Sequence, residues 1–298
     1  MTASMIVPST ITLDASNVPE TDYLEWVSGT TYNTGDRVIR ASTHKVYEDV
    51  IGGVSNVAPE SDANRWSVVG STNRWRAFDS SLGQSVAQSG TITYSLTVNE
   101  KSRAVVMVGL SATDLRVVVK DGAGTVKADQ SRNIVDTSGV ADWEQYFTYE
   151  TDYDPDQVFM GLPIYVGYTV EITIDAGGGV AEVGEILIGR DVTLGKIGNG
   201  ARSGFTDYSA RNVDEFGNLT LIRRASARKA EWPLIFDTAA NRRIQRELEN
   251  ARGTICYFHP GDEMANFYLG VLGLADEFFP ELSAGGTTFA TLSLTGVS

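Results

Sequence analysis

Apolar side chains recur at every second position through most of this chain, and this alternation constrains its fold more than any other feature. In residues 91–98, Ile92, Tyr94, Leu96 and Val98 share one face, and residues 287–295 alternate in the same way. A period of two is the pattern of a half-buried β-strand. Short apolar runs separated by Gly, Asp and Asn continue between these segments without a fixed repeat, so we expect a mainly β, multidomain fold.

Four regions follow from changes in this pattern. Residues 1–22 contain two prolines and isolated apolar positions, and are predicted to form an extended N-terminal arm. Residues 23–70 combine aromatics with many turn signals, as suits a small β module. Residues 71–195 are predicted to form a β-sandwich, with residues 177–179, all glycine, as the turn before its last strand. Residues 196–298 are predicted to form a C-terminal β-rich domain, reached through a glycine-rich crossing.

The C-terminal region carries the clearest helix signal, at about residues 238–252. Asp237 can cap the helix, strong helix formers follow, and Gly253 can end it. Ile244, Leu248 and Ala251 would form its buried stripe. We therefore expect one α-helix packed on the C-terminal strands.

Few side chains suit catalysis. A single cysteine, Cys256, excludes an internal disulfide framework, and two histidines, His44 and His259, are too few for a three-histidine metal centre. We interpret His259 as structural because a general base also needs an oriented partner. We predict a non-enzymatic protein without a cofactor. The alternative of a glycan-degrading enzyme rests on an acidic cleft formed by Asp142, Glu144, Glu150 and Asp152.

An acidic stretch also resembles the first half of an EF-hand calcium loop. Asp152, Asp154 and Asp156 recur at every second position, so their carboxylates could converge on a cation. Gln157 replaces the loop's glycine, and Pro163 replaces its bidentate glutamate. We therefore predict a solvated acidic loop and no metal, with these three aspartates as a weak calcium candidate.

Charge is strongly unbalanced along the chain. The net charge of -14 should repel phosphates, so nucleic acid is excluded as a partner. Residues 196–256 nevertheless hold eleven basic against seven acidic side chains. Arg242, Arg243 and Arg246 lie on one side of the predicted helix, either as a solvated face or as a docking surface for an acidic neighbour. A repeated head-to-tail contact with further copies of the chain would make a ring.

No segment is suited to a membrane. The longest apolar run, residues 104–110, is far below the ~20 residues that a spanning helix needs. The first thirty residues carry no lysine or arginine, so they lack the charged start of a secretory signal. We expect synthesis in the cytoplasm and no membrane insertion.

The small module resembles the chitin-binding-type carbohydrate-binding modules attached to chitinases and endoglucanases. The resemblance covers about a sixth of the chain and rests on an ordered set of residues: Trp26, Tyr32, Gly35-Asp36-Arg37-Val38, Tyr47, Pro59 and Trp66. It implies carbohydrate binding through Trp26, Tyr32, Tyr47 and Trp66. In that family exposed aromatics commonly follow the central tyrosine, whereas Glu48-Asp49-Val50-Ile51 stands here. A spacer or packing module is therefore the favoured interpretation.

The rest of the chain resembles tail proteins of bacteriophages and prophages. The matching segments, in order over roughly residues 70–298, are residues 70–79 (GSTNRWRAFD), 184–189 (GEILIG), 207–209 (DYS), 214–218 (DEFGN), 224–225 (RA) and 292–296 (LSLTG). This resemblance implies a structural virion protein at the tail tip or baseplate. It also implies a galectin-like or jelly-roll sandwich beside a tail-associated β domain, and no catalysis.

We therefore predict a phage tail-tip component, made in the host cytoplasm and carried in the virion. Its partners would be other copies of itself, other tail proteins and, if the module binds sugar, host-surface glycan. Assembly would use Arg242, Arg243 and Arg246. The alternative is a free or surface carbohydrate-binding protein, without catalysis, in the manner of a lectin.

Overall fold

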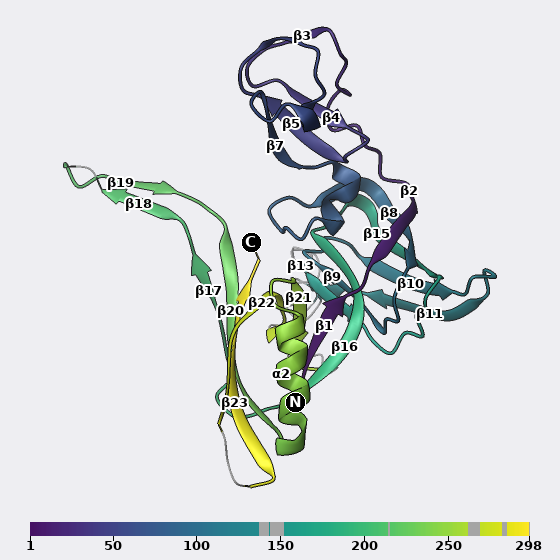
Figure 1. Cartoon of the computed structure of the whole chain (residues 1–298), viewed down its shortest axis with the longest axis vertical. Helices are drawn as coiled ribbons and strands as arrows, with labels where there is room; N and C mark the ends of the chain where they lie inside the picture. The colour runs from purple at the N-terminus through teal and green to yellow at the C-terminus, as the bar shows by residue number, and fades with distance from the viewer. Residues whose placement is uncertain (137–142, 144–151, 214, 262–268, 282–284, 298) are drawn as a thin grey trace.

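The computed structural model describes residues 1–136, 143, 152–213, 215–261, 269–281 and 285–297. The chain is mainly β, with several sheets and a helix packed on the C-terminal strands, as predicted (Figure 1). In the described part, no helix has both the length and the apolarity to cross a membrane.

One antiparallel sheet has five strands in the order β11-β10-β15-β8-β2. Their bounds are β2 Ile11–Ser16, β8 Val86–Val98, β10 Asp114–Lys120, β11 Val126–Asn133 and β15 Tyr168–Val183. In β8 the side chains at 92, 94, 96 and 98 are buried and those between them are less so. The alternation read from the sequence is thus the division between the core face and the outer face.

A larger sheet has nine strands in the order β14-β9-β16-β1-β21-β22-β23-β20-β17. Their bounds are β1 Thr2–Pro8, β9 Ala104–Val108, β14 Asp156–Phe159, β16 Glu185–Ile197, β17 Arg202–Asp207, β20 Ser226–Asp237, β21 Cys256–His259, β22 Val271–Glu281 and β23 Thr287–Gly296. The five-stranded sheet packs on β14, β9 and β16 across an apolar core that includes Met107, Phe159, Ile172 and Ile188. These two layers form the predicted sandwich.

The end of β16 also pairs with β20, so β16, β1, β21, β22, β23 and β20 follow one another in a closed series of pairings. Helix α2 (Asn241–Asn250) follows the short helix η3 (Thr238–Ala240) and buries Ile244 and Leu248 among these strands. Asp237 accepts a 2.7 Å hydrogen bond from the Ala239 amide, and Gly253 adopts a φ of 75° just after the helix. Asp237 thus caps η3, from which α2 continues, and Gly253 follows the end of α2, so the helical segment begins and ends close to the predicted positions.

The small module contains two sheets of its own. Strands β3 (Thr30–Tyr32) and β6 (Gly53–Ser55) pair, and β4 (Arg37–Arg40), β5 (Lys45–Asp49) and β7 (Trp66–Ser71) form a three-stranded sheet. Helix η1 (Pro59–Ser61) precedes β7, and helix η2 (Asn73–Phe78) follows it. The module stands at one end of the molecule, beyond the sandwich (Figure 1). Two further two-stranded pairs are β12 (Val135–Asp136) with β13 (Asp152–Tyr153), and β18 (Ala210–Val213) with β19 (Leu219–Ile222).

Three predictions about the organisation need correction. Residues 1–22 are not a separate arm, because β1 lies inside the nine-stranded sheet between β16 and β21, and β2 forms an edge of the sandwich. The boundary predicted at residue 195 falls within β16, which belongs to both the sandwich and the C-terminal strands. Residues 177–179 make no turn between strands, since they lie in β15 at an irregularity in its pairing with β8.

Candidate functional site

The four aromatics predicted to bind carbohydrate form the core of the small module. Tyr47 is 4% exposed and Trp66 is 2% exposed, and the ring of Tyr32 meets Trp66 edge-on at 5.3 Å. Trp26 is half-buried, donates from Nε1 to Ser55 Oγ at 3.0 Å, and is covered by the Arg40 guanidinium at 5.3 Å. Stacking on a sugar needs a flat open ring face. The burial of Tyr47 and Trp66 is that of a packing module, and carbohydrate binding through Trp26 and Tyr32 stays a prediction.

A buried ion pair, which the sequence did not indicate, holds the same module together. Asp49 is fully buried, and Arg65 donates to Asp49 Oδ2 from Nε at 2.9 Å and from Nη2 at 2.7 Å. The other carboxylate oxygen accepts from the amides of Ile51 and Gly52. Burial acts to raise the pKa of Asp49, but these hydrogen bonds outweigh it and lower the pKa. Asp49, which stands where the sugar-binding family commonly has exposed aromatics, therefore stabilises the interior of the module.

A second polar cluster fixes the module to the sandwich. Glu20, just before the module, accepts hydrogen bonds from Thr72 Oγ1 at 2.9 Å and from Trp75 Nε1 at 3.3 Å. His44, in a turn of the module, lies 3.1 Å from Glu20 and stacks on Trp75 at a centroid distance of 4.1 Å. The chain thus enters and leaves the module at adjacent positions, so the module is held as an insertion.

The predicted assembly arginines lie together on the exposed face of α2. Arg242, Arg243 and Arg246 are all exposed, on the opposite side of the helix from Ile244 and Leu248. Arg243 donates from Nη2 to the Thr193 carbonyl at 3.0 Å, which ties this face to β16. We call these three residues, together with neighbouring Arg190, the arginine face.

Two carboxylates of α2, Glu247 and Glu249, lie beside the arginine face. Glu247 pairs with Arg190 at 2.8 Å. This hydrogen bond, with the further positive charges of Arg246 and Arg243, lowers the pKa of Glu247. Four arginines against these two glutamates leave the face positively charged.

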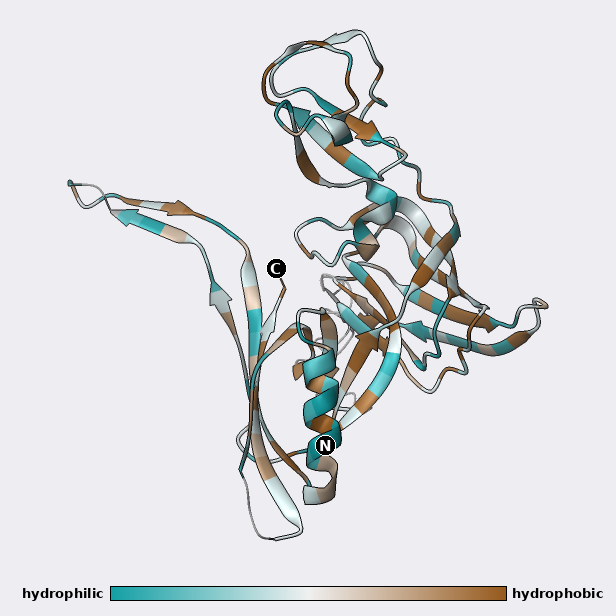
Figure 2. Ribbon diagram, in the orientation of Figure 1, coloured by the Kyte–Doolittle hydropathy of each residue, from teal (hydrophilic) through white to brown (hydrophobic). Residues whose placement is uncertain are grey.

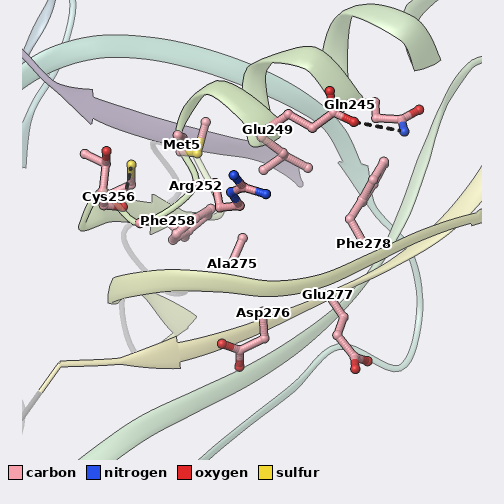
Figure 3. A pocket seen from close by; sticks show the side chains of 14 residues that line it. Met5, Gln245, Glu249, Arg252, Cys256, Phe258, Ala275, Asp276, Glu277 and Phe278 are labelled. Atoms are coloured by element: carbon pink, nitrogen blue, oxygen red, sulfur yellow. Dashed lines mark hydrogen bonds between the residues drawn. The ribbon is translucent and has the colours of Figure 1, made fainter.

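A cavity of about 220 Å³ lies between α2 and β22 (Figure 3). Its floor is apolar and includes Met5, Leu248, Phe258 and Phe278. Cys256 also lines it, and burial raises the pKa of its thiol to about 12. A protonated thiol is a poor nucleophile, so the cavity is suited to packing rather than to covalent chemistry.

A β-arm projects from the body of the molecule (Figure 1). It consists of β17, β18, β19 and the start of β20, and its tip is the β18–β19 pair. One face holds a recess of about 520 Å³ whose lining includes Phe205, Leu219 and Leu221 with Arg211 and Arg223. Phe205 is 74% exposed, and the hydrophobic positions of β19 stand out in Figure 2. We call this surface the arm face.

Two of the three aspartates of the weak calcium candidate, Asp154 and Asp156, have protein partners, and Asp156 is buried, which corrects the expectation of a solvated loop at this position. Asp156 is 3% exposed and forms an ion pair with Arg228 of β20, while Asp154 accepts from Gln157 Nε2 at 2.7 Å. The side chain of Asp152 lies outside the described residues. Among the residues that are described, no group of three His, Cys, Asp or Glu side chains could hold a metal ion. Asp156 thus stabilises the fold, because its ion pair with Arg228 joins β14 to β20 across the curved sheet.

The acidic cleft considered for a glycan-degrading enzyme falls outside the described part of the chain, since Asp142, Glu144, Glu150 and the Asp152 side chain are not described.

His259 is 3% exposed, accepts at Nδ1 from the Gly261 amide at 3.2 Å, and lies 3.8 Å from Asp191. These contacts place His259 in the interior beside its own turn.

Comparisons with known proteins give no relative for this chain. No protein-family model and no curated protein matches it. Among solved structures, a chain from reduced XRCC1 bound to the catalytic domain of DNA polymerase β is 11% identical. The match covers 44% of this chain and 83% of that chain with a TM-score of 0.24, which is too low to carry an argument.

Proposed function

We propose that this protein is a non-catalytic structural component of a bacteriophage tail tip or baseplate. It assembles with further copies of itself and with other tail proteins, and resides in the virion. The resemblance of residues 70–298 to tail proteins motivates this role. The observation that carries it is the β-arm, which presents an apolar and basic surface away from the folded body.

The arm face is physically unsuited to remain in water. An isolated two-stranded pair is at best marginally stable, and Leu219 and Leu221 at its tip are 64% and 60% exposed. Exposed apolar groups mixed with charge are typical of interaction sites. Three arginines line the recess against one aspartate, Asp207, whereas the whole chain has a net charge of -14. The occupant that we assign to the arm face is therefore a neighbouring copy of this acidic chain.

Replacing Leu219 and Leu221 with serine should weaken self-assembly at least tenfold without unfolding the chain. Burial of each leucine side chain on docking contributes about 1.5–3 kcal/mol to the free energy of association. The substitutions cost little stability in the free subunit because both side chains are exposed there. Sedimentation velocity of the full chain over a concentration series measures the change. Serine at Val126 and Val180, which are 50% and 52% exposed on the sandwich, is the matched control and should leave assembly unchanged. If both variants lost assembly to the same extent, the arm would not be part of the interface.

Immunogold electron microscopy tests the virion role directly. Phage particles from the source culture, labelled with an antibody against this chain, should carry gold at the tail end. Particles that are present but unlabelled, alongside label on the free protein, would contradict the proposal.

A further inference from the structure

The outer surface of β20, β23 and β22 is acidic and apolar. Register places three rows of side chains across the strands: Glu231, Ser293 and Glu277; Pro233, Thr291 and Phe279; and Ile235, Phe289 and Glu281. The residues between them along β20 and β23, including Trp232, Leu234 and Leu292, belong to the core on the other side. We call the nine residues of these rows the acidic face.

The acidic face has the character of a docking surface. Phe279 is 65% exposed near the end of β22, and Phe289 is 50% exposed near the start of β23. Glu277 and Glu281 flank Phe279 along β22, Glu281 is also paired with Phe289, and Glu231 lies at the far corner of the three rows. The nine positions include no basic residue, and Lys229 and Arg202 border them beside Glu231. A pair of exposed phenylalanines framed by carboxylates is suited to arginine, whose guanidinium binds both groups and whose stem covers apolar surface.

The arginine face lies on the opposite side of the same strands. Helix α2 packs its buried stripe onto the inner surface of the sheet, so Arg242 and Arg246 point away from it. In Figure 3 the helix lies above β22, with Phe278 directed toward it and Glu277 directed away. One subunit therefore presents a positive surface on one side and a negative, aromatic surface on the other.

We propose that the arginine face of one copy docks on the acidic face of the next copy. The two surfaces differ in charge and belong to opposite sides of one subunit, so the contact is head-to-tail. A two-fold dimer would bring arginine against arginine or glutamate against glutamate, and such like-charge contacts are unfavourable. Repetition of the head-to-tail contact closes a ring or extends an array. This inference rests on the proposed function in so far as both require self-assembly, and it names the surfaces that meet.

Charge reversal on each surface tests the contact in the full chain. R242E/R246E changes only the arginine face, and E277R/E281R changes only the acidic face. Both pairs are exposed, so circular dichroism should show an unchanged fold. Each variant alone should assemble about 100-fold more weakly in sedimentation velocity, because like charges then face one another. An equimolar mixture should recover assembly, since every contact in an alternating arrangement again joins opposite charges.

Arg116 and Lys127 on the sandwich provide the matched control. R116E/K127E makes the same change in net charge as R242E/R246E, on exposed side chains far from both faces in the fold. It should assemble like the native chain. The proposed contact would be overturned if the native protein stayed monomeric at its highest soluble concentration. It would also be overturned if the mixture failed to recover assembly, or if the control variant lost as much assembly as the charge variants.

The outcome separates this contact from the virion role. Gold at the tail end with charge variants that assemble normally would refute the contact and keep the function. Recovery in the mixture with unlabelled phage particles would keep the contact and refute the function.

Discussion

Replacing Asp49 with alanine should unfold the small β module while the sandwich and the C-terminal strands stay folded. The change leaves the buried Arg65 guanidinium without its carboxylate and removes the acceptor for two backbone amides. Breaking a buried ion pair from one side costs about 4 kcal/mol because an unpaired charge stays in the interior. A module core of this size has few other contacts to offset that loss.

Hydrogen exchange of the full chain measures this effect where it arises. Peptides from β5 and β7 should lose about 1000-fold of their protection, the equivalent of about 4 kcal/mol, whereas peptides from β8 and β15 should not change. Asp129→Ala is the matched control, because Asp129 also pairs with an arginine, Arg116, but on the exposed surface. That variant should exchange like the native chain.

A double variant tests whether the unpaired charge of Arg65 causes the loss of protection. D49L/R65M removes both charges and places apolar groups of similar length in the interior, which is often close to neutral. It should regain much of the lost protection in β5 and β7. If D49A and the double variant were equally unprotected, packing at position 49 rather than an unpaired Arg65 would explain the loss.

The strands and the helix were predictable because local rules decide them. Alternation along β8 and β23 reflects one face turned to the core, and the helical segment of η3 and α2 follows from the Asp237 cap, the apolar stripe and Gly253. Each signal lies within one segment. Such signals can be recognised without knowing which segments pair with one another, which is why the sequence alone indicates these elements.

The order of the strands could not be predicted, because it depends on pairs far apart in the chain. Ala3, Met5 and Ile6 appear in the sequence as scattered apolar positions, yet all are fully buried in β1 between β16 and β21. A strand buried on both faces shows no alternation. The N-terminal residues were therefore predicted as an arm, and β16 as the end of a domain.

The two proposed docking faces could be predicted only in part, because one depends on a single helix and the other on strands that are distant in the sequence. The exposure of Arg242, Arg243 and Arg246 follows from helical spacing. The acidic face needs three strands in register, although the alternation of Glu277, Phe279 and Glu281 is a local signal that could have indicated it. Family resemblance left two roles for the module's aromatics, sugar binding and packing, with packing favoured, and the structure shows that Tyr47 and Trp66 face inward.

Replacing Glu185 with glutamine should stabilise the protein by about 5 kcal/mol at pH 8 and by less than about 1 kcal/mol at pH 5. Glu185 begins β16, is 7% exposed, and accepts a 3.0 Å hydrogen bond from the Ser80 amide. Burial raises the pKa of its carboxyl to about 9, and the nearby charge of Asp79 acts in the same direction. The carboxyl is thus neutral in the folded protein at pH 7 and ionised in the unfolded chain.

The sign of the pH dependence follows from this difference in protonation. Between its ordinary pKa of 4.5 and its native pKa of about 9, the folded state holds one proton more than the unfolded state. The free energy of unfolding therefore falls by about 1.4 kcal/mol for each pH unit over that window, and the contribution is complete only below pH 4.5. Glutamine keeps the acceptor for Ser80 but cannot ionise, so it removes this loss.

Urea unfolding of both proteins at pH 5, 6, 7 and 8 measures the difference. The gap in unfolding free energy should widen steadily with pH, and Glu215→Gln, on the exposed arm, should show no such trend. A gap that stays constant from pH 5 to pH 8 would mean that Glu185 is ionised in the folded protein. A buried, unpaired carboxylate beside Asp79 would then be tolerated at the start of β16, and the folded state would have to compensate its desolvation by contacts other than the Ser80 amide.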